Sequence, residues 1–222
     1  CTKPSLVGTF KYYSIEKVFC SYNSFVLPLV AYLFFASGIN NFAKLPILEK
    51  DVLNVDTFSE KTFDNKISIL IFLGNNIQKK KGDILNLNQK IYKRFYEFND
   101  FQFIALGPIE IKKQIEDLVG ELSTGTNTEM TKWFFLFQDS EDTKNIFKSL
   151  RTNLELDEFG GSPYVFIVDK NGYLRGRNDS DGIKFGYDIR SVAELNNYMV
   201  DDIKIILAEY RLALKKNNIS NN

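Results

Sequence analysis

Residues 162–175 read SPYVFIVDKNGYLR, and this stretch decides the fold. Five β-forming residues, Tyr164 to Val168, follow Pro163, and the turn sequence DKNG at 169–172 separates them from a second extended pair. The pattern predicts a buried strand, a tight turn and a returning strand. We expect Asn171-Gly172 to supply the positive φ of the turn. Pro163 has no N–H to donate, so it suits the first residue of a strand.

An apolar run, Lys66 to Leu73 (KISILIFL), lies well upstream of this hairpin and is typical of a central strand covered on both faces. Between the two, strand and helix patterns alternate. Strands are expected at 101–106 and 133–137, and helices at 83–98, 109–122, 140–150 and 191–216. Asp83 and Ser140 are the expected N-caps of the first and third helices. The last helix would run about 40 Å, so its final turns should project beyond the domain.

This succession predicts an α/β fold of three layers, with a central mixed sheet, a terminal β-hairpin and a long C-terminal helix. The 222 residues suffice for one well-buried domain and an extension. Lysine plus arginine and aspartate plus glutamate both number 28, so we expect no nucleic acid partner. The chain has no histidine, which excludes Ser-His or Cys-His catalysis and ordinary zinc or copper sites.

The two cysteines, Cys1 and Cys20, both precede the predicted domain. A first residue of cysteine is what cleavage of a bacterial lipoprotein precursor leaves, so we expect lipidation at Cys1. The alternative is an arbitrary start of the sequence with an ordinary free thiol. A diacylated cysteine would hold the chain at a membrane surface.

Residues 25–36, FVLPLVAYLFFA, form the most hydrophobic window of the chain. Three interpretations stay open: a segment buried against a partner or in a membrane interface, a transmembrane anchor, or part of the domain core. A spanning helix needs about 20 apolar residues, more than this window holds. We expect residues 1–50 to be a membrane-associating extension and residues 51–222 to form the domain.

The hairpin resembles that of the thioredoxin superfamily, in which a proline just ahead of a strand faces the redox site. The resemblance implies a thioredoxin-like fold and a cis peptide bond between Ser162 and Pro163. Within the superfamily the chain is most similar to the Sco branch over about residues 44–215. The matching features are Lys44-Leu45-Pro46, the W-x-F-L strand of Trp133, Phe135 and Leu136, and the ending F-x-V-D-x-x-G-x-x-R-G, present as Phe166, Val168, Asp169, Gly172, Arg175 and Gly176.

The resemblance also locates a site that has lost its chemistry. Sco proteins bind copper through two cysteines after the central strand and a histidine before the hairpin. Here Asn75 and Lys79 fall at about the cysteine positions, and residues 159–163 read FGGSP. We therefore predict no catalytic, cofactor-binding or metal-binding residue and no cofactor. Lys79 to Lys81 form either a solvated loop or an anion or partner contact.

Three functions follow from these observations. The first is a redox-inactive, non-enzymatic accessory subunit that is anchored in the bacterial cell envelope, with its domain in the periplasm and membrane protein complex subunits as partners. The second is a thiol-disulfide reductase or copper-delivery protein that uses unusual groups, either Cys20 or the carboxylates Glu155, Asp157 and Glu158. The third is a binder of extended peptides in the groove beside Pro163.

Overall fold

The computed structural model describes residues 44–56, 59–180 and 182–220, together with residues 26, 28–30 and 32; of residues 214–220 it describes the backbone. The chain divides into two units, Cys1–Asn41 and Phe42–Asn222. In the first unit the described positions are helical, and the side chains of Leu29, Val30 and Tyr32 are exposed. The predictions for Cys1, Cys20 and most of the 25–36 window lie outside the described residues. Among those that are described, no helix has both the length and the apolar character to cross a membrane.

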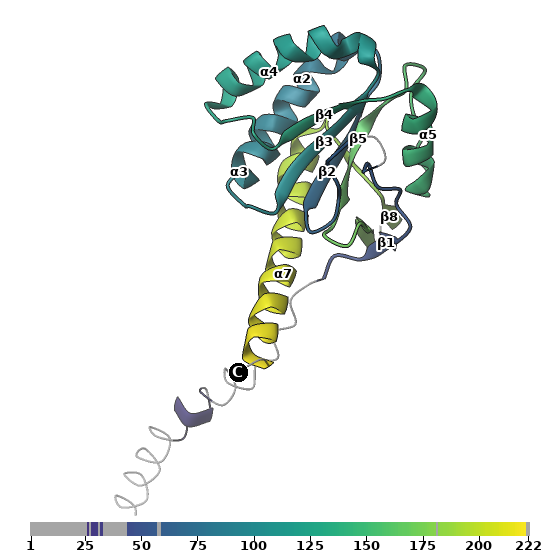
Figure 1. The fold of residues 1–222 in the computed structure, drawn as a ribbon. Coiled ribbons are helices and arrows are strands. Elements are labelled where there is room, and N and C mark those ends of the chain that lie inside the picture. Colours follow the sequence, from purple (N-terminus) through teal and green to yellow (C-terminus); the bar gives the residue numbers. More distant parts are fainter. Residues whose placement is uncertain are drawn as a thin grey trace, which may run out of the picture. The chain divides into compact units, whose positions relative to one another are not determined.

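The second unit is built on a mixed sheet with the strand order β1-β6-β5-β2-β3-β4, and β9 also pairs with β5 (Figure 1). The strands are β1 (Ile47–Glu49), β2 (Ile67–Leu73), β3 (Phe101–Gly107), β4 (Trp133–Phe137), β5 (Gly161–Val168), β6 (Leu174–Arg175) and β9 (Tyr187–Asp188). A separate hairpin joins β7 (Arg177–Asp179) to β8 (Gly182–Lys184). Because β2, β3 and β4 are parallel and β5 and β6 form an antiparallel hairpin beside β2, the fold is thioredoxin-like, as predicted.

Helices cover both faces of this sheet. They are α2 (Ile77–Leu87), η1 (Asn88–Tyr92), α3 (Lys93–Phe95), η2 (Ile109–Ile111), α4 (Lys112–Thr126), α5 (Ser140–Ser149), α6 (Val192–Glu194), η3 (Leu195–Met199) and α7 (Val200–Ser220). Alternate residues of β2 point to opposite faces: Ile69 and Ile71 join the core under α2, α4 and α7, whereas Leu70 and Phe72 join the core under α5. The predicted three-layer arrangement is therefore confirmed.

The first helix begins earlier than predicted. Its N-cap is Asn76, whose side chain accepts a hydrogen bond from the Lys79 N–H, so Asp83 lies in the middle of α2 instead of at its start. The third helix is capped by Asp139 and not by Ser140, because the Asp139 carboxylate accepts the N–H groups of Glu141 and Asp142. The sequence pattern missed both caps because each lies outside the apolar stripe of its helix.

The predicted cis bond at Ser162–Pro163 is wrong, since no peptide bond among the described residues is cis. Strand β5 begins at Gly161, before the proline, and its register with β2 shifts there: Ile71 lies opposite Val165, and Leu73 lies opposite Gly161. The resulting bulge takes up Pro163, which cannot donate to a ladder, within an extended chain. In the turn after β5 only Gly172 has positive φ (76°), so Asn171 does not share the role expected of it.

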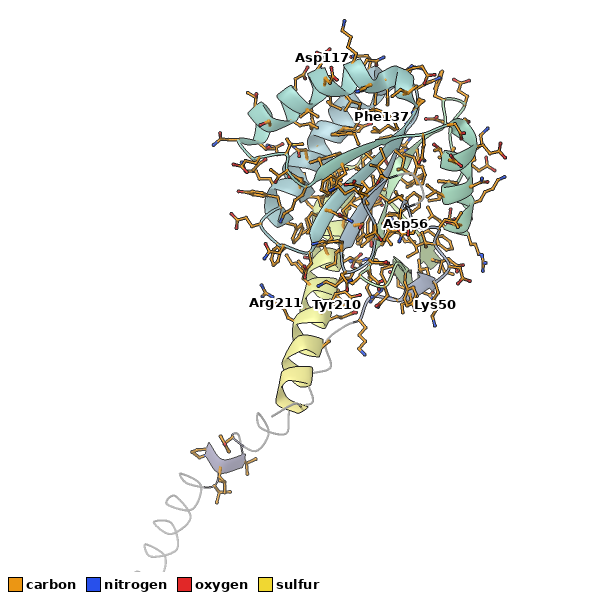
Figure 2. All side chains as sticks on the ribbon, viewed as in Figure 1. Lys50, Asp56, Asp117, Phe137, Tyr210 and Arg211 are labelled. Carbon is orange, nitrogen blue, oxygen red and sulfur yellow. The ribbon has the colours of Figure 1, made fainter. Side chains whose placement is uncertain are left out.

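Both ends of the domain extend beyond the central strands. The segment before β2 contains β1, which pairs with β6. Helix α7 extends past the sheet, and its side chains are exposed from Arg211 to Ala213, which confirms the predicted projection (Figures 1 and 2).

Candidate functional site

The carboxyl ends of β2, β3 and β4 lie together at one end of the sheet, where open α/β folds bind their ligands. A pocket of about 730 Å³ lies at this end. Residues at the ends of the three strands, together with a loop just before β5, contribute to its lining: Gly74, Asn75, Gly107, Pro108, Gln138, Asp139 and residues 156–160. This is the place to which the sequence resemblance assigns the redox site of thioredoxin-like proteins.

The turn from β2 into α2 is packed directly against the loop before β5. Gly74 has φ 68°, and the Asn75 N–H donates to the Phe159 carbonyl at 3.0 Å. A Cβ on Gly74 would lie 2.7 Å from both Gly161 N and Phe159 O. The backbone of residues 159–161 therefore occupies the space beside the turn, and no side chain fits at position 74.

Asp157 organises this loop. Its Oδ1 accepts the N–H groups of Phe159 (3.0 Å) and Gly161 (2.8 Å), and its Oδ2 lies 2.9 Å from Lys80 Nζ. Lys80 reaches across from the first turns of α2, and a Cβ on Gly161 would lie 1.9 Å from its ammonium. A partly exposed ion pair and two backbone hydrogen bonds thus hold the loop against the start of α2.

The lysine run lies in helix α2, so of the two alternatives given for it the solvated loop is wrong. Besides the ion pair of Lys80, Lys79 Nζ lies 4.9 Å from the centre of the Phe159 ring, and Lys81 Nζ lies 2.6 Å from Glu121 Oε1 on α4. All three lysines therefore contact groups of the same chain. The sequence did not reveal the pairing of Lys80 with Asp157, because the two residues are far apart in the chain and belong to no motif.

Burial raises the pKa of the Asp157 carboxyl, but Lys80 and the two backbone N–H groups outweigh it, so the net pKa lies below its ordinary value. A carboxyl whose pKa is lowered by folding stabilises the protein above its unfolded pKa and loses that contribution as the pH falls. We expect Asp157→Asn to lower the free energy of unfolding by about 1 kcal/mol at neutral pH. The difference from the parent should vanish between about pH 5 and pH 2. Urea titrations across this range measure it, and parallel pH curves for the two proteins would contradict the assignment.

The residues at this end of the sheet offer none of the soft ligands that copper prefers. Asn75 and Lys79 carry no sulfur, and the loop before β5 contains Phe159, Gly160 and Gly161 and no histidine. Among the three loop carboxylates, Asp157 is engaged by Lys80 and by backbone N–H groups. Within the described part of the chain, no three His, Cys, Asp or Glu side chains are grouped to hold a metal ion.

The hairpin motif has a structural role. Its turn lies at the opposite end of the sheet from the pocket, because β5 runs antiparallel to β2. Asp169 Oδ1 accepts the N–H groups of Asn171 and Tyr173 in the turn, and its Oδ2 pairs with Arg175 at 2.8 Å. Gly176 is needed because a Cβ there would lie 2.3 Å from the Lys184 carbonyl oxygen. The conspicuous residues of the motif therefore build the hairpin and contribute nothing to the pocket.

The backbone beside Pro163 is already hydrogen-bonded. The Pro163 carbonyl accepts the Ile189 N–H at 3.0 Å, the Tyr164 N–H donates to Ser162 Oγ, and β9 pairs with Tyr164 and Val165. An extended peptide at this strand would have to displace these bonds, which weakens the third function suggested by the sequence.

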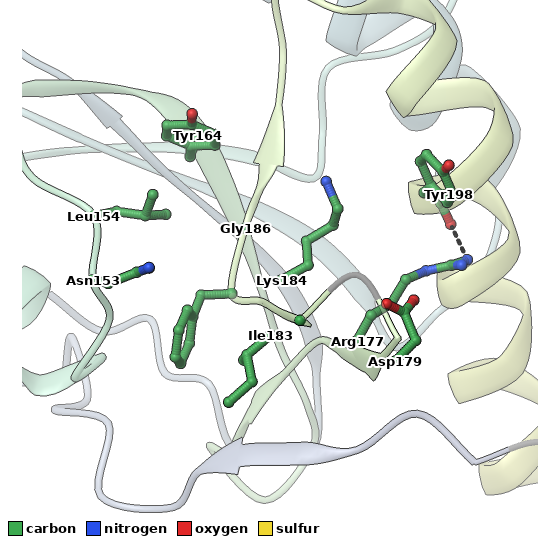
Figure 3. Close-up of a pocket in the computed structure, with 11 residues that line it drawn as sticks. Asn153, Leu154, Tyr164, Arg177, Asp179, Ile183, Lys184, Gly186 and Tyr198 are labelled. Carbon is green, nitrogen blue, oxygen red and sulfur yellow. Dashed lines mark hydrogen bonds between the residues drawn. The ribbon is translucent and has the colours of Figure 1, made fainter.

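A second pocket, of about 380 Å³, lies between the β7–β8 hairpin and Tyr198 (Figure 3). Its two cations have partners: Arg177 forms two hydrogen bonds to Asp202, and Lys184 Nζ lies 2.9 Å from Glu194 Oε1. The Arg177 guanidinium also lies over the Tyr198 ring. These interactions fix the hairpin onto η3 and α7 and leave no cation here to attract an anionic ligand.

No family model matches the chain, and no curated protein matches it either. Solved structures do match. BsSco, a member of the Sco family of cytochrome c oxidase assembly proteins, is 16% identical, with a TM-score of 0.45 over 73% of this chain and 98% of that one. The thioredoxin domain of a thiol-disulfide oxidoreductase from Bacteroides vulgatus is 12% identical, with a TM-score of 0.40 over 74% and 98%. A SCO1/SenC family lipoprotein from Bacillus anthracis is 12% identical, with a TM-score of 0.41 over 70% and 98%. These likenesses concern the fold alone.

Proposed function

We propose that this chain is a redox-inactive, thioredoxin-like accessory subunit, attached to a membrane and acting through its surfaces within a bacterial cell-envelope complex. The observation that carries the proposal is the set of residues at the start of α2, which includes no thiol. Thiol-disulfide exchange needs a thiolate, and a helix N-terminus is one place where the pKa of a thiol is lowered. Gly74, Asn75 and Asn76 stand there instead, and the loop at 157–161 packs on them through the ion pair of Lys80 with Asp157.

Two features would attach the chain to a membrane. Lipidation at Cys1, or the apolar segment at 25–36, would place the domain at the periplasmic side of a membrane. The domain keeps a fully packed core on both faces of its sheet. A fold that is kept rigid without its chemistry is suited to hold other subunits in position.

A thiol-disulfide assay tests the inactive site. We expect the full chain, purified in mild detergent, to reduce insulin disulfides no faster than the uncatalysed dithiothreitol reaction. The Cys20→Ser variant should behave identically. Catalysis that disappears in Cys20→Ser would instead support the alternative, a reductase or copper-delivery protein working through that thiol.

Co-purification tests the role as a subunit. Membranes solubilised in mild detergent should yield the chain together with other membrane proteins at fixed stoichiometry, and the mass of the native N-terminus should include a diacylglyceryl group on Cys1. Recovery of the chain with no other protein would count against the proposed role.

A further inference from the structure

Strand β4 ends the sheet with an unpaired side. It pairs with β3 along its whole length, and among the described residues no strand lies on its other side (Figure 1). The Phe103 N–H donates to the Lys132 carbonyl, and the Gln138 N–H donates to the Gly107 carbonyl. Even-numbered residues of β4 therefore direct their backbone groups toward β3. Because these groups alternate along a strand, the N–H and C=O of Phe135 and Phe137 point outward.

The two edges of the sheet differ in their protection against pairing with another strand. At one edge, β1 is three residues long, its register with β6 is broken, and Pro46 and Lys50 flank it. These features discourage edge-to-edge pairing. At the other edge, β4 reads WFFLF, with no charge, no proline and an uninterrupted register. Its side chains after Trp133 are only partly buried.

We propose that two copies of this chain pair antiparallel through β4, with Phe135 opposite Phe135 of the partner subunit, so that the two sheets become one. The sequence of β4 fits this symmetry, because aromatic residues occupy its centre and both ends. Trp133, Phe135 and Phe137 share one face, on which Trp133 already stacks on Phe135 at 5.4 Å. Across the twofold axis, Trp133 would meet Phe137 of the partner subunit, an aromatic pair of the kind that stabilises sheets.

The flanking residues agree with the same register. Lys132 would lie opposite Gln138 of the partner subunit, and Thr131 opposite Asp139 of the partner subunit, so no like charges meet. This inference goes beyond the proposed function, since an accessory subunit could equally be a monomer. A monomeric chain would leave the proposed function unchanged.

Proline at position 135 tests the pairing. The Phe135 N–H points away from β3, so Phe135→Pro removes a donor to the partner and none to the rest of the sheet. Phe135→Val loses the same ring but keeps the N–H. By sedimentation of the full chain in mild detergent, we expect the parent and Phe135→Val to be dimers and Phe135→Pro to be a monomer. A monomeric parent, or a dimer that persists in Phe135→Pro, would overturn the inference.

A disulfide test does not depend on the stability of the proline variant. In the proposed register Phe134 lies opposite Leu136 of the partner subunit at a non-hydrogen-bonded position, with about 4.5 Å between Cα atoms, which suits a disulfide. With Cys1 and Cys20 replaced by serine, Phe134→Cys/Leu136→Cys should form a covalent dimer on oxidation, and Phe134→Cys alone should not. A double variant that forms no covalent dimer, or a single variant that cross-links as readily as the double, would refute this register.

Discussion

Arg175→Leu is expected to lower the free energy of unfolding by about 3–5 kcal/mol, because it leaves buried carboxylates without their counterion. The Arg175 side chain is 5% exposed, and that of Asp169, 2.8 Å away, is 1% exposed. The other terminal nitrogen of Arg175 lies 2.7 Å from Glu209 Oε2 on α7, and the Arg175 Nε donates to the Leu45 carbonyl at 2.9 Å. One guanidinium therefore joins the hairpin, the C-terminal helix and the segment before β1.

The matched control is Arg190→Leu, which breaks an arginine–aspartate pair at the surface. Arg190 lies 2.6 Å from Asp188, but its side chain is 57% exposed, so the loss should stay below about 1 kcal/mol. Urea unfolding of the three proteins measures the difference. Hydrogen exchange should also show faster opening around Leu45 in Arg175→Leu, since the Leu45 N–H donates to the Glu209 carboxylate that the arginine holds. Similar losses in both variants would contradict the buried network.

Strands β2 and β4 could be predicted from the sequence because a run of β-forming residues is a local feature of composition. The run at 67–73 is apolar except for Ser68, and the WFFLF segment at 133–137 is apolar throughout; the structure places β2 and β4 at these residues. The start of α2 could not be predicted from its apolar stripe, because six polar or small residues separate Ile77 from Ile84. The sequence feature that marks the start of this helix is the N-cap residue Asn76.

Long-range contacts explain the remaining differences. Strands β7, β8 and β9 are two or three residues long, too short for a sequence pattern to reveal. Side chains of β7 and β9 reach distant residues: Arg177 and the Tyr187 hydroxyl both donate to Asp202 on α7. Strand β5 starts at Gly161 because that residue fits against β2 and Lys80, which no local pattern around Pro163 reveals. The lack of cysteine at the start of α2 can be read from the sequence, whereas the packing of the loop at 157–161 against Gly74 could not be predicted.

Gly74→Ala is expected to destabilise the protein by about 2–5 kcal/mol, from the left-handed backbone conformation and from steric overlap together. Gly74 has φ 68°, and the atoms that a Cβ would meet, Gly161 N, Phe159 O and Gly161 Cα, all belong to the backbone. No flexible side chain can move aside to relieve the overlap. The loop before β5 must therefore shift as a unit, which stretches the hydrogen bond from the Asn75 N–H to the Phe159 carbonyl.

Gly82→Ala provides the matched control in the adjoining helix. Gly82 lies in the middle of α2, and a Cβ there would meet nothing within 4 Å, so alanine should stabilise the protein by about 1 kcal/mol. The same substitution is thus expected to have opposite signs at positions 74 and 82. Chemical denaturation gives both values, and exchange of the Asn75 and Gly161 amides reports the loop. If Gly74→Ala unfolded like its parent, the loop at 157–161 would not be packed against the turn that leads into α2.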